Sequence, residues 1–358
     1  MSAEIKITLP DGTEKTYPTG MTVLGVAESI GAGLARAALA GQVDGRTVDL
    51  NHKIDADAKL SILTFRDDAG KEVYWHSTAH VMAQAVQDLF PNAKVAIGPP
   101  IEGGFYYDFD VDEPFTPEDL EKIEKRMGQI AKEDQSFERS ELPRDDAYKM
   151  FEEMGESYKL EILEGISSDE TISIYKNADK FTDLCRGPHV SRTGRIKSVK
   201  LLSSSGAYWR GDERNKMLQR IYGISFPDKK ELKAHLDLLE EAKRRDHRTI
   251  GKQLDLYSFS DQVGPGLVLW HPKGMRVRHQ IEDFWRAAHF EGGYELVGSP
   301  HIGRSTLWET SGHLEFYKDD MYAPMDVEGQ SYYAKPMNCP FHSMIYKNSR
   351  RSYRDLPF

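Results

Sequence analysis

The sequence predicts an α+β protein composed of several units in series, and three observations support this prediction. Its 358 residues correspond to two or three domains if one domain holds about 100–200 residues. Segments in which apolar and polar residues alternate, as in strands, are interspersed with segments whose apolar residues recur at helical spacing. Hydrophobic residues make up 39% and charged residues 29%, a composition typical of soluble globular domains.

Residues 1–63 have the pattern of a small β-grasp, ubiquitin-like module. Ile5, Ile7 and Leu9 alternate with polar residues, as expected for a strand with one buried face. The segments that follow predict a turn, a return strand, a helix and two strands, at residues 10–12, 16–19, 23–40, 40–43 and 59–63. Such ββαββ modules mostly bind or position other groups, so we expect no catalytic residue in this one.

Residues 64–227 form a second predicted unit, in which helices and strands are mixed. Its clearest helix start is Thr116-Pro-Glu-Asp119, where proline occupies the first turn and acids lie near the positive end of the helix. Apolar spacing predicts helices at residues 73–90, 116–130, 145–154 and 158–166. Alternation predicts strands at residues 105–109, 171–175 and 197–203.

Residues 228–251 predict a highly charged linker helix, and residues 252–358 a third unit. Within the third unit, apolar residues at positions 277, 281, 284, 285 and 288 predict an amphipathic helix. Residues 294–297 predict a strand that leads into Ser299-Pro300.

Charge and cysteine content exclude several classes of protein. The net charge of −10 argues against a protein held to nucleic acid by bulk charge, although it allows a local basic patch. Two cysteines cannot form a disulfide framework, so we expect a reducing cytoplasm. The longest uncharged run, residues 73–87, is shorter than the roughly 20 apolar residues of a membrane span, and we expect no membrane partner. The sequence contains neither a P-loop nor a Rossmann fingerprint.

Two short motifs carry the chemistry of a candidate site. His76 and His80 are four residues apart, which places both on one helix face, where they can hold a metal or act as an acid–base pair. A zinc protease would need Glu directly after the first histidine, but Ser77 stands there. Cys185 and His189 flank a Gly-Pro turn and can face one cleft. The four residues form either a tetrahedral zinc set or a metal-free hydrolytic pocket, and their spacing does not decide which.

A third motif is Pro336-Met-Asn-Cys339-Pro-Phe-His342. A lone cysteine between prolines is usually a small buried residue. It could also be a zinc ligand, but a structural zinc needs about four ligands and only His342 is near it in the sequence.

With these motifs in place, the chain resembles the bacterial threonine–tRNA ligases, which are class II aminoacyl-tRNA synthetases. His76-x3-His80 followed by Cys185-x3-His189 is similar to the editing domain that these enzymes share with alanine–tRNA ligases. Residues 264–300 resemble the entry to the catalytic domain and its motif 1, and residues 335–342 resemble the segment with the first zinc ligand. Residues 353–358 resemble the opening of motif 2, which implies an N-terminal portion of such an enzyme, truncated within the catalytic domain.

The resemblance implies four parts: a TGS β-grasp domain, an editing domain, a linker helix and the first part of a class II antiparallel-sheet domain, at residues 1–63, 64–227, 228–251 and 252–358. For the parent enzyme it implies threonine, ATP, Mg²⁺ and tRNA as reactants, a homodimer through the motif 1 helix, and a cytoplasmic location. It also implies hydrolysis of seryl-tRNA in the editing domain. Serine lacks only one methyl group of threonine, a difference worth about 1–3 kcal/mol in binding.

The resemblance also implies roles for particular residues. The residues expected to line the editing pocket are His76, His80, Lys159, Asp183, Cys185 and His189. A neutral histidine, with a pKa near neutral pH, would activate water, and Lys159 would stabilise the developing oxyanion or the terminal ribose hydroxyl. We expect the pocket to work without metal. Cys339 would be the one ligand present here of the Zn²⁺ in the parent's synthetic site.

Other functions stay open. A zinc-dependent trans-editing hydrolase without ligase activity would need the second unit but no motif 1 helix. A zinc hydrolase acting on small molecules would need neither the β-grasp module nor the basic linker. A protein that only binds tRNA would show no deacylation.

Overall fold

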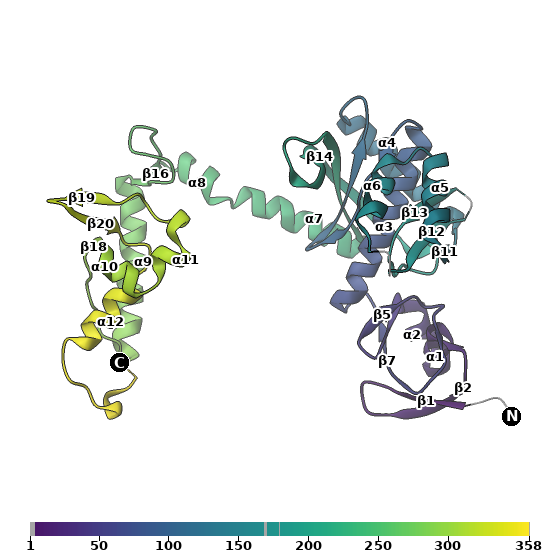
Figure 1. Cartoon of the computed structure of the whole chain (residues 1–358), viewed down its shortest axis with the longest axis horizontal. Helices are drawn as coiled ribbons and strands as arrows, with labels where there is room; N and C mark the ends of the chain where they lie inside the picture. The colour runs from purple at the N-terminus through teal and green to yellow at the C-terminus, as the bar shows by residue number, and fades with distance from the viewer. Residues whose placement is uncertain (1–3, 168–169, 179, 358) are drawn as a thin grey trace. The chain divides into compact units, whose positions relative to one another are not determined.

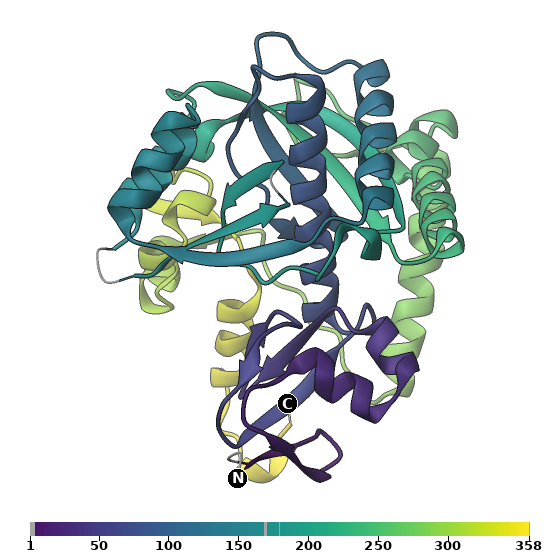
Figure 2. The same cartoon turned by 90° about the vertical axis from the view of Figure 1, so that its right-hand side faces the viewer.

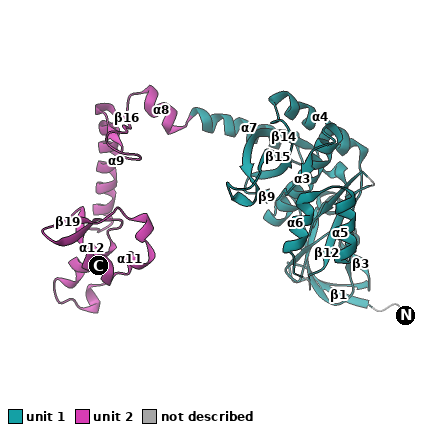
Figure 3. Ribbon diagram, turned by 45° about the horizontal axis from the view of Figure 1, so that its top comes forward, with its two compact units in different colours: residues 1–244 teal, residues 245–358 magenta. Residues whose placement is uncertain are grey.

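The computed structural model describes residues 4–167, 170–178 and 180–357, and it divides the chain into two compact units (Figure 3). The first unit spans residues 1–244 and the second residues 245–358. No helix in the described part of the chain combines the length and the apolar character needed to cross a membrane.

The first unit begins with a mixed five-stranded sheet in the order β2-β1-β7-β4-β5 (Figure 1). Its strands are β1 (Glu4–Thr8), β2 (Glu14–Pro18), β4 (Ala40–Val43), β5 (Arg46–Val48) and β7 (Ala58–Leu63), and a short pair is formed by β3 (Met21–Thr22) and β6 (Lys53–Ile54). Strand β1 is antiparallel to β2 and parallel to β7. This topology confirms the predicted β-grasp module.

Two helices cover the β-grasp sheet, where the sequence predicted one helix over residues 23–40. They are α1 (Val23–Ile30) and α2 (Ala32–Ala37), and the chain is extended at Gly31 between them. Ile7, Val23 and Leu60 are buried in the core that these elements share.

The rest of the first unit is built around a sheet in the order β14-β15-β10-β8, with β9 paired to β10. Its strands are β8 (Lys94–Val95), β9 (Pro100–Ile101), β10 (Gly104–Asp110), β14 (Ser198–Tyr208) and β15 (Met217–Phe226). Helices α3 (Asp68–Leu89) and α4 (Pro117–Glu133) contact each other and this sheet (Figures 1 and 2). Helix α3 is buried over most of residues 73–86, which explains the uncharged run in the sequence.

A second, three-stranded sheet in the order β11-β12-β13 carries two shorter helices. These elements are β11 (Phe137–Leu142), α5 (Arg144–Glu153), α6 (Ser157–Gly165), β12 (Ile172–Asn177) and β13 (Phe181–Leu184). Phe151, Leu163 and Ile174 form their common core. Two single 3₁₀ turns, η1 (Thr193–Arg195) and η2 (Trp209–Gly211), lie in the connections of the larger sheet.

The linker helix predicted over residues 228–251 is two helices in the structure. Helix α7 (Lys229–Arg244) belongs to the first unit and α8 (His247–Gln253) to the second. The prediction of one continuous helix is wrong because Asp246 caps a new helix: its side chain accepts a hydrogen bond from the Arg248 amide.

The second unit contains the predicted amphipathic helix and a small antiparallel sheet in the order β18-β20-β19. Its elements are β16 (Tyr257–Ser258), β17 (Leu269–Trp270), α9 (Pro272–Glu291), β18 (Ile302–Arg304), α10 (Ser305–Thr310), α11 (His313–Phe316), η3 (Lys318–Asp320), β19 (Met325–Val327), β20 (Gln330–Ala334), α12 (Cys339–Lys347) and η4 (Tyr353–Asp355).

One strand prediction in the second unit is wrong. Residues 294–297 are not a strand, because no strand among the described residues pairs with them. The segment resembling motif 2 ends at Phe358, which lies outside the described residues.

Candidate active site

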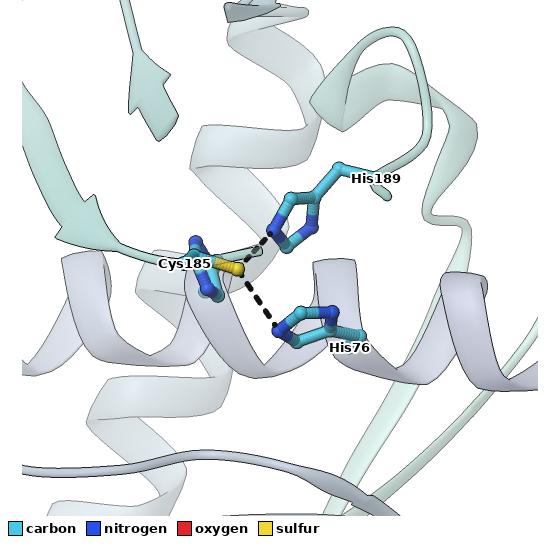
Figure 4. A group of neighbouring side chains, drawn as sticks. His76, Cys185 and His189 are labelled. Atoms are coloured by element: carbon cyan, nitrogen blue, oxygen red, sulfur yellow. Dashed lines mark hydrogen bonds between the residues drawn. The ribbon is translucent and has the colours of Figure 1, made fainter. Parts of the chain in front are cut away.

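Three histidines and one cysteine meet in the interior of the first unit, and these four residues with their surroundings are called the pocket below. His76 and His80 project from one face of α3, as their spacing predicted, and Cys185 and His189 follow β13. The ligand atoms of all four side chains lie within 4.8 Å of one another. Figure 4 shows the Cys185 sulfur between two rings, 3.4 Å from His76 Nε2 and 3.3 Å from His189 Nε2. The structure thus brings together the two motifs that the sequence singled out.

The hydrogen bonds around Ser77 determine the proton position on His189. The Ser77 hydroxyl donates to the Val73 carbonyl, so its oxygen accepts, both from the Val190 amide and from the ring of His189. His189 Nδ1 therefore carries the proton. Its other nitrogen, Nε2, presents a lone pair to the Cys185 sulfur.

A buried ion pair lies behind His80. The ammonium of Lys159 contacts the carboxylate of Asp183, and the two side chains are only 2% and 3% exposed. Lys159 Nζ also donates to the Ala96 carbonyl (2.7 Å) and to the Tyr107 hydroxyl (3.1 Å). The Tyr107 hydroxyl donates in turn to Asp183 Oδ2 (2.7 Å). Lys159 and Asp183, both predicted from the family resemblance, thus form one network.

His80 is oriented by this network. Its Nε2 lies 3.3 Å from Asp183 Oδ2, and an ionised carboxylate can only accept, so Nε2 carries the proton. Nδ1 is then a buried acceptor, and it has no hydrogen-bond partner among the described residues. A buried acceptor of this kind is a place where a water molecule or a substrate hydroxyl group gains a hydrogen bond.

Burial keeps the pocket groups uncharged. It lowers the pKa of His76 to about 4 and that of His80 to about 3, although the charge of Asp183 acts in the opposite direction. Burial also lowers the pKa of His189 and raises that of the Cys185 thiol, so both are neutral at pH 7. The expected histidine pKa near neutral pH is therefore wrong, because that expectation assumed exposure to water.

Asp183 is the exception, since it is ionised despite its burial. Desolvation raises its pKa, but the charge of Lys159, the electrostatic interaction with the His80 ring and the hydrogen bonds from Lys159 and Tyr107 outweigh this effect, and the net result is a lowered pKa. The pocket therefore combines the buried ion pair of Asp183 and Lys159 with three neutral imidazoles.

Two residues that the sequence did not single out position His189. Asp49 of the β-grasp module accepts a hydrogen bond from the His189 amide (2.9 Å) and another from the Tyr175 hydroxyl (2.7 Å). The Tyr175 ring meets the His189 ring with centroids 4.5 Å apart. Nothing in the sequence relates Asp49 to residues more than 120 positions away. Tyr107, by contrast, could have been predicted to be buried, because it falls on the apolar face of the alternating segment 105–109.

The turn between the cysteine and His189 requires glycine. Gly187 has φ +68°, and a Cβ there would lie 2.0 Å from the Tyr175 hydroxyl oxygen. The Gly187 amide also donates to the Cys185 sulfur (3.2 Å). The turn therefore directs the thiol toward the histidines, as the sequence predicted.

The donor set of the pocket fits a divalent metal such as zinc. Neutral imidazoles with free nitrogen lone pairs and a thiol that can lose its proton are the usual ligands of Zn²⁺, and four such groups converge here.

Cys339 is not part of this group of four residues, and it is exposed at the start of α12. In the described part of the chain, it belongs to no group of three or more potential metal ligands, so these residues alone do not form a zinc site.

We expect the stability of the first unit to fall between about pH 6.5 and pH 4. The folded-state pKa values of His76 and His80 are lowered, so below pH 6.5 the unfolded chain binds protons that the folded chain does not. Stability is therefore full above pH 6.5 and is lost as the pH falls, by roughly 1.4 kcal/mol per pH unit for each histidine.

Thermal denaturation at pH 7, 6 and 5 measures this effect. The variant His80→Asn should show a smaller loss of melting temperature than the wild type. A melting temperature that does not depend on pH over this range would contradict buried neutral histidines.

Two family models match the chain. One, the TGS domain, matches residues 5–64, and the other, the threonyl and alanyl tRNA synthetase second additional domain, matches residues 172–222. The second range includes Asp183, Cys185 and His189.

Curated relatives match nearly the whole chain. The threonine–tRNA ligase of Citrifermentans bemidjiense is 55% identical over 354 residues, which cover 99% of this chain and 55% of the relative. The threonine–tRNA ligase of Nitrosococcus oceani is 54% identical over 351 residues, covering 98% of this chain and 54% of the relative. The chain thus spans about half the length of the curated relatives it matches.

Two solved structures match smaller parts of the chain. The RNA-binding domain of threonyl-tRNA synthetase from Cryptosporidium parvum is 40% identical, covers 32% of this chain and 28% of that chain, and has a TM-score of 0.31. A threonyl-tRNA synthetase from Aeropyrum pernix is 31% identical, covers 27% of this chain and 23% of that chain, and has a TM-score of 0.26.

Proposed function

We propose that this chain, a relative of threonine–tRNA ligases along almost its whole length, hydrolyses mischarged seryl-tRNA in the pocket of His76, His80, Cys185 and His189. The observation that carries the proposal is the set of three neutral imidazoles beside a buried ion pair, with His189 oriented by Ser77 and His80 by Asp183. The match of residues 172–222, which include Cys185 and His189, to the threonyl and alanyl tRNA synthetase second additional domain supports the proposal.

In the proposed reaction, a histidine accepts a proton from water while the water oxygen attacks the carbonyl carbon of the seryl ester. The bond to the ribose oxygen then breaks, and that oxygen takes up the proton, which leaves serine and free tRNA. His76 is our candidate base, because it is less buried than His80 and His189 and its ring is neutral at pH 7. We propose that the pocket excludes threonine because it has no room for one more methyl group.

We propose a role for Lys159 that differs from the one expected. An ammonium has three N–H donors, and the contacts with Asp183, Ala96 and Tyr107 use all three. None is left for an oxyanion or a ribose hydroxyl in this arrangement. We therefore propose that Lys159 acts by keeping Asp183 ionised, which in turn fixes the orientation and the proton of His80.

The assay that tests the proposal compares deacylation of seryl-tRNA and threonyl-tRNA by the same protein preparation. We expect hydrolysis of the seryl ester well above the rate without protein, and little hydrolysis of the threonyl ester. Equal hydrolysis of both esters would contradict the exclusion of threonine, and no hydrolysis of either would leave a protein that only binds tRNA.

We further propose that the parent enzyme charges tRNA with threonine at the expense of ATP with Mg²⁺, in the cytoplasm. The similarity to threonine–tRNA ligases supports this, and the second unit would supply part of the synthetic domain. Helix α9, whose Ile281, Phe284 and Trp285 are all at least half exposed, is our candidate for the homodimer contact. Cys339 would contribute one ligand to a zinc site completed by other residues.

We expect the pocket to work without metal. Treating the purified protein with a chelator should leave seryl-tRNA hydrolysis unchanged, and metal analysis by mass spectrometry should find less than one zinc per pocket. The control is the variant Cys339→Ser, which removes a candidate zinc ligand that lies outside the pocket. The competing function, a zinc-dependent trans-editing hydrolase, is favoured by the donor set of the pocket. It predicts stoichiometric zinc that survives in Cys339→Ser, and activity lost to the chelator.

A further inference from the structure

The tip of the β14–β15 hairpin holds the helix that carries Lys159. The buried indole of Trp209 donates a hydrogen bond to Glu161 Oε2 (2.8 Å), and the guanidinium of Arg210 donates to the Glu161 carbonyl (3.1 Å). Glu161 lies two residues after Lys159 on α6. Both bonds therefore attach the hairpin tip to the helical turn that presents the ammonium to the pocket.

A second set of contacts reaches the residue before Lys159. The rings of Trp209 and Tyr158 meet edge to face with centroids 5.0 Å apart, and the Tyr158 hydroxyl donates to Asp110 Oδ2 (2.9 Å). Trp209 and Tyr158 form a buried apolar cluster with Ala96 and Leu218. The carbonyl of Ala96 is itself an acceptor for Lys159 Nζ, so the cluster also fixes one of the three partners of the ammonium.

Arg210, which donates to the Glu161 carbonyl, has an unfavourable backbone conformation. Arg210 has φ +55° and ψ +20°, a left-handed conformation that costs a residue other than glycine about 1–2 kcal/mol. The amide of Asp212 and the side chain of Asn215 both donate to the Trp209 carbonyl and hold the tip in this conformation. Glycine would adopt it freely but would lack the guanidinium that binds α6.

We propose that Trp209 and Arg210 are positioning residues for the hydrolytic site. They fix α6 so that the Lys159 ammonium stays on Asp183 and Tyr107, and Asp183 in turn orients His80. This inference rests on the proposed function for its catalytic readout, but not for its structural one.

The variants Trp209→Phe and Arg210→Gly test the proposal. The first keeps a ring against Tyr158 and removes the N–H donor, and the second eases the backbone and removes the guanidinium. For both we expect kcat of seryl-tRNA hydrolysis to fall about tenfold with KM within twofold. The control Arg214→Ala removes a cation of the same tip whose described bonds go to Asp212, and it should leave kcat unchanged. Glu161→Gln, which keeps a side-chain oxygen for the indole, should retain activity that Glu161→Ala loses.

A second background separates positioning from general stability. If the tip acts through the ion pair, Trp209→Phe should cause no further loss of kcat in a protein that already carries Lys159→Met and Asp183→Asn. The same tenfold loss in both backgrounds would overturn the proposal, and so would unchanged kcat in Arg210→Gly.

Hydrogen exchange of residues 157–165 provides a readout that needs no activity. Exchange of these α6 amides should be faster in Arg210→Gly than in the wild type, at equal melting temperature, while Arg214→Ala should match the wild type. Unchanged exchange in Arg210→Gly would overturn the proposed contact. If the wild type hydrolyses no seryl-tRNA, the proposed function fails, but the exchange measurement still decides whether the tip holds α6.

Discussion

Replacing His76 with alanine should reduce the rate of seryl-tRNA hydrolysis by about 10²–10⁴-fold, the range that a positioned general base contributes. The ring is neutral at pH 7 because burial lowers its pKa to about 4, so it can accept a proton there. The reaction should be followed as loss of radiolabelled serine from tRNA at pH 7. Binding of uncharged tRNA, measured in parallel, should change less than twofold.

The control for this experiment is His247→Ala. His247 is an exposed histidine at the start of α8, well outside the four-residue group, and its removal should not change hydrolysis. His76→Gln adds a finer comparison, since glutamine keeps a polar side chain but cannot accept a proton from water at neutral pH. If seryl-tRNA hydrolysis survived in His76→Ala, His76 would not be the base.

The pocket itself was largely predictable from the sequence, for a simple geometric reason. Residues four apart on a helix share a face, so His76 and His80 had to point the same way once α3 formed. The Gly-Pro turn brought Cys185 and His189 onto the same side. Lys159 and Asp183 came from the family resemblance, and the structure joins them as an ion pair.

The proton positions and charges of the pocket were not predictable. They depend on burial and on partners from distant segments, such as Ser77 for His189 and Asp183 for His80. The role of Asp49 could not be predicted for the same reason, because this residue belongs to the β-grasp module and contacts His189 only in the folded structure. The break of the linker helix, however, could have been predicted from the local sequence. Aspartate is a favourable helix N-cap, and Asp246 caps α8 shortly after α7 ends at Arg244.

Removing the cation of the buried ion pair should strongly destabilise the first unit. Lys159→Met leaves the Asp183 carboxylate buried without its charged partner, and breaking a buried pair in this way costs about 3–5 kcal/mol. The free energy of unfolding in urea, with the first unit monitored by the fluorescence of Trp75 and Trp209, measures this loss. The same variant should also lose most of its seryl-tRNA hydrolysis, because Asp183 without its cation no longer holds His80 in one orientation.

The double variant Lys159→Met, Asp183→Asn decides whether the loss arises from the unpaired charge. Asparagine has almost the shape of aspartate and can still accept a hydrogen bond from Tyr107, so the double variant should be more stable than Lys159→Met alone. Lys180→Met is the matched surface control. The side chain of Lys180 is 54% exposed and that of its partner Glu133 is 32% exposed, and such surface pairs contribute about 0–1 kcal/mol. If the double variant were no more stable than Lys159→Met, the lost free energy of unfolding would come from lost packing of the Lys159 side chain. That result would contradict the proposal that Lys159 stabilises the charge on Asp183.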